Sequence, residues 1–235
     1  MTRARRACID PPSSADALAQ AARDAMRLVD HRWVVVDVET TGTGPLWGDR
    51  ITEIALVVVE QGRITRSWSA LVNPQRRIPV FITRLTGISD AMVEHQPTFA
   101  ERMGEIEPVL AAGTFVAHNA AFDWGFVSAE VHRATGAPLA GDRVCTVRLA
   151  RKFLRHLPRR SLDMVCQHYG IGNGARHRAL GDATATAQVL LRLLDDASRQ
   201  GIDTWGDLQD LFARRTGTRR RRSALPQPSD GGPTA

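Results

Sequence analysis

The sequence predicts a single α/β domain in which helices cover a mixed β-sheet. Three apolar, β-branched runs follow one another between residues 33 and 72, and shorter strand-like runs then alternate with helical segments. The length of 235 residues and the hydrophobic content of 43% suffice for one sizeable core. They are too small for two full domains with linkers.

The expected sheet begins with a meander of three strands. Residues 33–38 form a nearly continuous β-branched run, which is typical of a strand buried on both faces. Residues 51–60 form the second strand, Gly62 supplies the turn, and residues 64–72 return as the third strand. Two further short strands are expected at residues 115–118 and 144–146.

An amphipathic helix is expected before the sheet, at residues 14–29, with an apolar stripe that is able to pack on the core. This stripe consists of Leu18, Ala22, Ala25 and Val29. Helical periodicity and terminating glycines predict the other helices after the third strand. They are expected at residues 81–85, 98–110, 122–134, 147–157, 161–169, 180–194 and 204–214.

The expected domain organisation is a main domain with short additions at both ends. The parts are a helical extension at residues 1–30, the domain at 31–198, a C-terminal helix at 199–214 and a basic tail at 215–235. The net charge of +6 equals the charge of six arginines near the C-terminus, Arg214, Arg215 and Arg219 to Arg222, so the remaining chain is formally neutral. Such a run predicts a solvated, disordered tail, and a nucleic-acid-binding arm is the alternative.

Several classes of protein are excluded by composition. No apolar run approaches the roughly 18 residues of a membrane span, and the N-terminus lacks the apolar stretch of a signal peptide. The three cysteines do not have the spacing of a zinc site. We therefore expect a cytoplasmic protein without a membrane partner or structural zinc.

Two acids interrupt the most apolar strand. Asp37 and Glu39 are two residues apart, so both carboxylates lie on the same face of the sheet, at the strand's C-terminal end. Two ionised carboxylates side by side need compensation if they are buried. A strand end whose acids face water is the alternative. Thr40, Thr41 and Gly42 follow in a loop where open α/β sheets bind ligands.

Two further acids and one histidine are candidate site residues. Asp123 and Asp182 each lie in the first turn of an expected helix, where a carboxylate that merely complements the helix dipole is the alternative. His177 lies five residues before Asp182, in the loop that enters the helix. A histidine beside a carboxylate cluster is a candidate general base, although a lone surface histidine is common.

Read together, these segments resemble the three motifs of the DEDDh exonuclease superfamily. The segments are Asp37 to Gly42, His118 to Asp123 and His177 to Asp182. The similarity covers about residues 33–196 and includes the stretches 51–55, 85–88 and 161–163. Within the superfamily the chain looks most like the epsilon-type proofreading subunits of bacterial DNA polymerase III and their stand-alone relatives. The resemblance implies a ribonuclease H-like fold.

The resemblance also implies a mechanism. Asp37, Glu39, Asp123 and Asp182 would hold two divalent cations, and His177 would take a proton from the attacking water. Oxygen ligands favour hard ions, so Mg²⁺ or Mn²⁺ is expected. The implied reaction is 3′→5′ hydrolysis of terminal phosphodiesters, preferably at single-stranded or frayed DNA ends, with release of nucleoside 5′-monophosphates during proofreading or repair.

The expected substrate-binding residues come from the same motifs and from nearby apolar positions. In such enzymes the positions of Thr40, Thr41 and Gly42 line the terminal nucleotide, while bases stack on apolar side chains. Core packing is the alternative for the two phenylalanines. The full set is Thr40, Thr41, Gly42, Leu85, His118, Asn119, Phe122 and Phe126. A run of basic residues from 148 to 160 either follows the substrate backbone or forms a solvated helix face.

Two alternative functions stay open. An RNA-trimming exonuclease would use the same acids, because these act on phosphate and no motif reports on the 2′-hydroxyl. A catalytically silent, nucleic-acid-binding polymerase subunit is the alternative from another class, and we disfavour it because all four acids and His177 are present. Association with a DNA polymerase is a further expectation from the resemblance.

Overall fold

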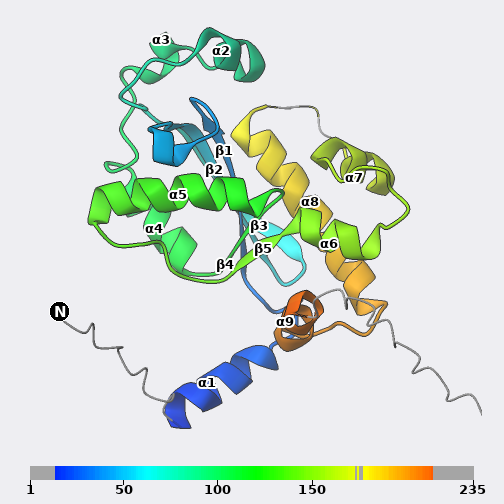
Figure 1. Cartoon of the computed structure of the whole chain (residues 1–235). Helices are drawn as coiled ribbons and strands as arrows, with labels where there is room; N and C mark the ends of the chain where they lie inside the picture. The colour runs from blue at the N-terminus through cyan, green and yellow to red at the C-terminus, as the bar shows by residue number, and fades with distance from the viewer. Residues whose placement is uncertain (1–13, 173, 175–176, 214–235) are drawn as a thin grey trace, which may run out of the picture.

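The structure is a computed structural model that describes residues 14–172, 174 and 177–213 (Figure 1). It contains a five-stranded mixed sheet in the order β3-β2-β1-β4-β5, which confirms the predicted fold class. β1 pairs antiparallel with β2 and parallel with β4. The strands are β1 (Trp33–Thr40), β2 (Ile51–Glu60), β3 (Arg63–Leu71), β4 (Thr114–Ala117) and β5 (Arg143–Cys145).

Helices cover both faces of the sheet (Figure 1). Those that precede β5 are η1 (Pro45–Trp47), α2 (Val80–Thr86), α3 (Asp90–Val93), α4 (Met103–Ala111) and α5 (Ala120–Thr135). Those that follow it are α6 (Thr146–Phe153), α7 (Leu162–Tyr169), α8 (Ala179–Ser198) and α9 (Trp205–Ala213). Within the described part of the chain, no helix combines the length and the apolar character needed to cross a membrane.

The alternation of side chains along β1 separates two hydrophobic cores. Val34 and Val36 belong to one core, together with side chains of α4 and α5. Trp33 and Val35 belong to the other, together with side chains of α6, α7, α8 and α9. Asp37 is two residues from Val35 on the same strand, so its side chain lies on the same face of the sheet, the face that α8 covers.

The N-terminal helix differs from the expectation. α1 (Ser14–Asp24) ends five residues early, because the following chain forms turns that are tied to the segment before α9: Arg27 forms a β-bridge with Thr204, and the Leu28 amide donates to the Asp203 carbonyl. α1 projects away from the sheet (Figure 1), and Leu18 of the predicted stripe is 73% exposed. The prediction that this stripe packs on the core is wrong.

Other boundaries shift for local reasons. The helix expected from residue 98 begins at Met103, because Thr98 and Glu101 bond to each other in a separate turn. α3 was not predicted, and four residues are too few for a periodic pattern. The basic tail expected at residues 215–235 lies outside the described residues.

Candidate active site

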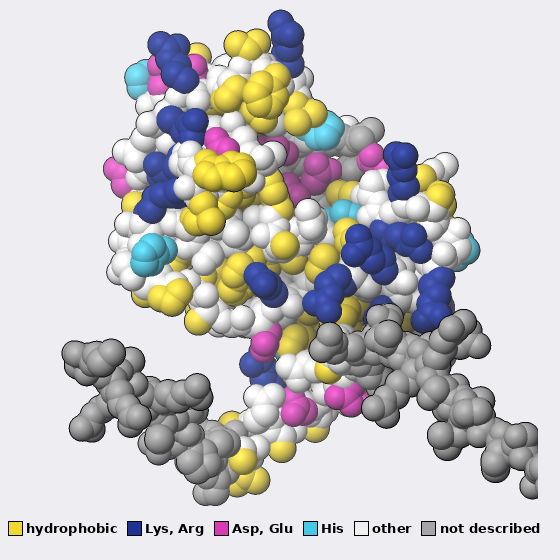
Figure 2. Space-filling view, in the orientation of Figure 1, with side chains coloured by type: hydrophobic (Ala, Val, Ile, Leu, Met, Phe, Trp, Pro, Cys, Tyr) yellow, Lys and Arg dark blue, Asp and Glu magenta, His cyan; other side chains and the backbone are white. Residues whose placement is uncertain are grey.

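Three carboxylates converge where β1 ends. β4 pairs with β1 only from Trp33 to Val35, so the C-terminal half of β1 has no strand partner on that side. Asp37 and Glu39 lie in this half, and Asp182 reaches them from the first turn of α8. One carboxylate oxygen from each of the three lies within 4.8 Å of the others. Figure 2 shows acidic side chains gathered in a hollow of the surface where β1 ends and α8 begins.

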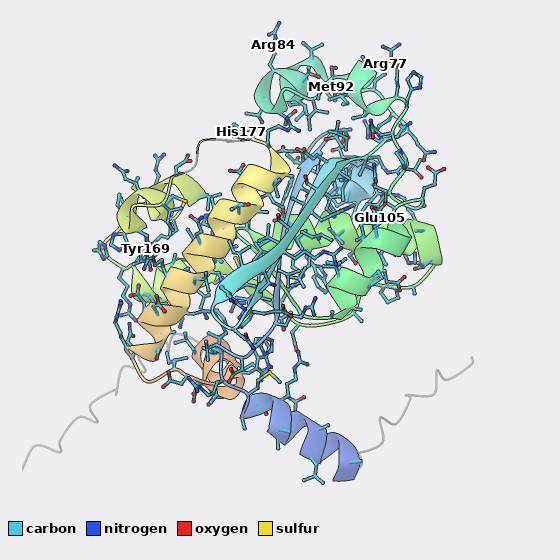
Figure 3. The ribbon with its side chains drawn as sticks, turned by 180° about the vertical axis from the view of Figure 1, so that it is seen from behind. Arg77, Arg84, Met92, Glu105, Tyr169 and His177 are labelled. Atoms are coloured by element: carbon cyan, nitrogen blue, oxygen red, sulfur yellow. The ribbon has the colours of Figure 1, made fainter. Side chains whose placement is uncertain are left out.

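His177 lies beside this cluster, at the entry to α8. Its amide donates to the Asp182 carboxylate at 3.0 Å, and its backbone has a left-handed φ of 58°. The side chain is half-buried, and Figure 3 shows it at the start of α8. The structure thus brings His177 and Asp182 together although their spacing does not place them on one helix face.

Asp123 approaches the cluster from α5. It is only 5% exposed, and its carboxylate accepts hydrogen bonds from its own amide and from the amide of Val38. The second bond ties α5 to β1 between Asp37 and Glu39. Asp123 is not among the three acids whose oxygens meet within 4.8 Å, but its charge raises the pKa of both β1 acids. All four predicted acids therefore share one electrostatic environment.

Burial and neighbouring negative charges raise the pKa values of Asp37 and Glu39, and burial raises that of Asp123. Burial, followed by the charges of Asp123 and Asp182, raises the pKa of Asp37 well above its usual value. Burial also raises the pKa of Glu39 to about 7, with the charge of Asp182 as the next cause. For Asp123, burial raises the pKa to about 7 despite its two backbone hydrogen bonds. Cations at this position would remove the electrostatic cost of ionising the carboxylates.

An ion pair that we did not predict holds the start of α8. Glu53 on β2 lies opposite Glu39 in the sheet register and is buried. Both of its oxygens accept hydrogen bonds from Arg178, at 2.7 and 3.1 Å, and one also accepts the Ala179 amide at 3.0 Å. Glu53 thereby fastens the residues between His177 and Asp182. An acid inside the apolar run of β2 was the available signal, because such an acid needs a partner.

In the loop that was predicted to bind substrate, the threonine hydroxyl groups form hydrogen bonds within the protein. The Thr40 hydroxyl donates to the Gly42 carbonyl, and the Thr41 hydroxyl donates to Asp49. Both threonines are buried, at 6% and 1% exposure, and their hydroxyl groups bond within the loop. That these positions line the terminal nucleotide stays a prediction. Gly42 is required by packing, because a Cβ there would overlap the Asp49 carboxylate.

The apolar candidates divide into two groups. Phe126 is 1% exposed and lies in the core with α4 and α5, so the prediction that it stacks on bases is wrong. Phe122 is half-buried against it, with ring centroids 4.9 Å apart. Leu85 on α2 is 54% exposed and remains available to a ligand.

The second motif contributes one structural and one accessible side chain. His118 Nε2 lies 2.9 Å from the Arg160 carbonyl, which only accepts, so this nitrogen carries the proton. Nδ1 then accepts from the Thr146 hydroxyl at 2.8 Å. Both ring nitrogens are engaged, and burial lowers the pKa of His118. The prediction that His118 binds substrate directly is therefore wrong, whereas Asn119 is exposed at the start of α5.

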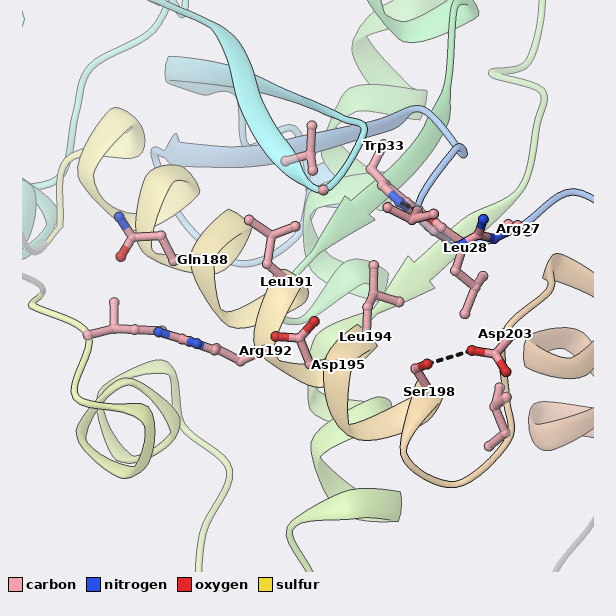
Figure 4. Close-up of a pocket in the computed structure, with 15 residues that line it drawn as sticks. Arg27, Leu28, Trp33, Gln188, Leu191, Arg192, Leu194, Asp195, Ser198 and Asp203 are labelled. Atoms are coloured by element: carbon pink, nitrogen blue, oxygen red, sulfur yellow. Dashed lines mark hydrogen bonds between the residues drawn. The ribbon is translucent and has the colours of Figure 1, made fainter.

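A cavity of about 430 Å³ lies away from the acids (Figure 4). It is lined by the second half of α8, including Leu191 and Ser198, and by Trp33 at the start of β1. None of the predicted site residues lines it.

The site has the donor set of a nuclease. Three carboxylates converge within 4.8 Å, with Asp123 nearby, and offer the oxygen atoms that hard divalent cations prefer, while a histidine lies beside them. Together with the mixed sheet, this arrangement defines a ribonuclease H-like nuclease. The family model of the RNase_T exonucleases matches residues 34–190, which contain all four acids and His177. The chain therefore belongs to this exonuclease family.

Two sequence relatives illustrate the match. The chain is 41% identical over 182 residues to the 3′–5′ exonuclease DinG of Bacillus subtilis, and the match covers 77% of the chain but 19% of DinG. It is 34% identical over 185 residues to the DNA polymerase III subunit epsilon of Aquifex aeolicus, covering 78% of the chain and 91% of the subunit. The chain thus spans about a fifth of DinG and nearly the whole epsilon subunit.

Solved structures agree with this family. Exonuclease X, solved in complex with 5′ overhanging duplex DNA, is 28% identical with a TM-score of 0.57, and the match covers 71% of this chain and 92% of that one. The nuclease domain of 3′hExo, a DEDDh family member bound to rAMP, has a TM-score of 0.63 at 19% identity, over 72% and 94% of the two chains. The second likeness confirms the ribonuclease H-like fold. The chain therefore carries an exonuclease domain of the RNase_T family, and two of its relatives are the 3′–5′ exonuclease DinG and a DNA polymerase III subunit epsilon.

Proposed function

We propose that the chain hydrolyses terminal phosphodiesters at the 3′ ends of DNA, preferably single-stranded or frayed ends, and releases nucleoside 5′-monophosphates. The observation that carries this proposal is the meeting of Asp37, Glu39 and Asp182 within 4.8 Å, beside His177. Paired carboxylates at such distances are suited to holding cations against a phosphodiester.

We further propose that Asp37, Glu39, Asp123 and Asp182 hold two divalent cations, Mg²⁺ or Mn²⁺. The fit is electrostatic: burial and neighbouring carboxylates raise the pKa values of Asp37 and Glu39, and burial raises that of Asp123, so bound cations would favour the ionised forms. When bound, such cations supply stabilisation of the charge that develops on phosphodiester oxygens.

His177 is proposed as the general base. It lies on the loop that enters α8, and its half-buried ring is within reach of water while its amide is fixed by Asp182. A histidine with this access is suited to taking a proton from the attacking water near neutral pH. Leu85, Asn119 and Phe122 remain predicted contacts of the terminal nucleotides, since each has exposed or half-buried surface.

DNA is favoured over RNA by the sequence relatives. The epsilon subunit is a DNA polymerase component by name, and Exonuclease X was solved with DNA. These two matches support a role in proofreading or repair, and the epsilon likeness supports association with a polymerase. We propose these roles for this chain, together with a cytoplasmic location.

A labelled-strand assay tests the proposal. A 5′-labelled single-stranded DNA 20-mer and the matching RNA are incubated with the protein and Mg²⁺, Mn²⁺ or EDTA. We expect a ladder that shortens from the 3′ end with either cation and not with EDTA, faster on DNA than on RNA. Chromatography of the released material identifies the nucleoside monophosphate.

Two isosteric variants of α8 make the assay specific. Asp182→Asn removes a proposed ligand, while Asp195→Asn changes an exposed acid on the same helix. We expect no ladder with the first variant and normal activity with the second. An active Asp182→Asn protein would contradict the proposed ligand set, and a ladder in EDTA would contradict the metal dependence.

A further inference from the structure

The segment that follows β5 is strongly basic. Between Asp142 and Asp163 the sequence contains seven Lys or Arg residues and no acid. Figure 2 shows Lys and Arg side chains gathered over α6 and the chain that follows it, on the same face of the molecule as the acidic hollow. The seven are Arg143, Arg148, Arg151, Lys152, Arg155, Arg159 and Arg160.

Apart from Arg155, whose Nε donates to the Lys152 carbonyl within the same segment at 3.3 Å, three of these residues have structural partners. The guanidinium groups of Arg143 and Arg148 lie over the rings of Trp124 and Phe212, at 5.3 and 4.4 Å from the centroids. Arg160 donates to the carbonyls of Leu154 and Arg155. The remaining four, Arg151, Lys152, Arg155 and Arg159, are here called the basic face.

The basic face has no acidic partner among the residues that the structure describes. Arg151, Arg155 and Arg159 are exposed, and none of the four forms an ion pair within residues 14–172, 174 and 177–213. These four cations lie in the last turn of α6 and in the chain that follows it, and without acidic partners they repel one another. A surface of this kind favours a polyanion as its ligand.

His118 connects the basic face to the acidic site. Its ring bonds Thr146, the first residue of α6, and the carbonyl of Arg160, so it holds both ends of the segment that carries the basic face. His118 itself lies between β4 and α5, five residues before Asp123. The basic face begins in the last turn of α6, with Arg151 and Lys152, and continues in the chain that follows it, with Arg155 and Arg159. The next residue, Arg160, contacts His118 beside the active site.

We infer that the basic face binds the phosphates of the nucleotides upstream of the 3′ end that occupies the acidic site. This inference rests on the proposed nuclease function and names where the remaining strand runs. Contacts to phosphates are independent of base sequence, and they offset the repulsion between the acidic cluster and the strand.

Paired charge-neutralising variants test this inference. Arg151→Gln/Arg155→Gln removes two cations from the basic face. Arg63→Gln/Arg66→Gln removes two exposed cations from β3, at the opposite edge of the sheet. The two double variants change the net charge equally, and all proteins retain the C-terminal arginines, so only the position of the lost charge differs.

Two substrates separate binding along the strand from the reaction. A single-stranded DNA 20-mer has upstream phosphates, whereas the p-nitrophenyl ester of thymidine 5′-monophosphate has none. At 0.1 M salt we expect the Arg151/Arg155 variant to lose about 10- to 30-fold in kcat/KM on the 20-mer, with a log–log salt dependence shallower by about 1.4. Its hydrolysis of the ester, and both activities of the β3 variant, should stay within twofold of wild type.

Other outcomes overturn the inference. Equal losses in both double variants would mean that net charge, not this face, governs binding, and an unchanged 20-mer reaction would mean that the strand runs elsewhere. A parallel loss on the ester would place the effect in the reaction site. If the wild type hydrolyses neither substrate, the proposed function fails, and fluorescence anisotropy with the labelled 20-mer still decides whether the basic face binds it.

Discussion

Replacing Glu39 with glutamine is expected to stabilise the metal-free protein at pH 8 and to abolish its nuclease activity. Burial and the charge of Asp182 raise the pKa of Glu39 from 4.5 to about 7. This pKa shift corresponds to a free-energy difference of about 3 kcal/mol between the ionised and the protonated form of Glu39 in the folded protein. The amide side chain of the Glu39→Gln variant would keep the shape of the protonated acid without the charge, so the variant avoids that cost at any pH.

The direction of the pH dependence follows from the raised pKa. Glu39 contributes its full stabilisation below about pH 4.5, and that contribution is lost as the pH rises through about 7. Asp123, whose pKa is also raised to about 7, loses its contribution in the same range in both proteins. Wild type should therefore lose more stability than the variant between pH 5 and pH 8 in EDTA. With saturating Mn²⁺ at pH 8, wild type should be more stable than the variant, because the Glu39 carboxylate then binds a cation.

Urea unfolding followed by tryptophan fluorescence measures these differences. We expect the Glu39→Gln protein to be more stable than wild type by about 1–3 kcal/mol at pH 8 in EDTA, and equal to it at pH 5. Glu107→Gln on the exposed side of α4 is the matched control and should change neither value. A Glu39→Gln protein that is less stable than wild type at pH 8 in EDTA would refute the electrostatic account of the site.

Three further variants probe the parts around the cluster. Glu53→Gln leaves Arg178 without its charged partner, so we expect kcat to fall about 10- to 100-fold with KM little changed. Steady-state kinetics measures both constants, and an unchanged kcat would mean that this ion pair is purely structural. His177→Ala should lower turnover by about 10²–10⁴-fold while calorimetric Mn²⁺ binding persists, and unaltered turnover would remove this residue as the base. Gly42→Ala places a Cβ against the carboxylate of Asp49 and should lower the free energy of unfolding by about 1–3 kcal/mol in urea titrations. An unchanged free energy of unfolding would mean that the Asp49 side chain moves aside without cost.

The sheet was predictable because its strands are defined by local pattern. The run at Ile51–Glu60 is predominantly apolar and is followed by the turn glycine Gly62, so its bounds in the structure equal the predicted ones. The N-terminal helix was harder. Its apolar stripe is a valid amphipathic pattern, but the chain after Asp24 pairs with the segment before α9, more than 170 residues away in sequence. No periodicity within α1 reports such a contact.

The candidate site, like the fold, could be predicted from the sequence only in part. Asp37 and Glu39 were identifiable because they interrupt an apolar strand, whereas Asp123, Asp182 and His177 were identifiable only when the three segments were read together. The structure brings all five into one region. The sequence could not separate the threonines after β1 and His118 from substrate ligands, because motif position says nothing about hydrogen bonding. Thr41 and His118 in fact use their polar atoms on Asp49, Thr146 and a backbone carbonyl.

The arrangement of these partners suggests how a cluster of mutually repelling acids keeps its geometry. The acids are on three supports: Asp37 and Glu39 on β1, Asp123 on α5 beside the Val38 amide, and Asp182 on α8, whose start is fastened to β2 by Glu53. Because the raised pKa values show that the ionised cluster disfavours the fold, the supports must hold the carboxylates in place before any cation binds. Preorganisation of this kind costs stability in the metal-free protein and lowers the cost of assembling the site when cations and substrate arrive. Removing a support such as Glu53 should therefore impair the reaction more than it weakens the affinity for the strand.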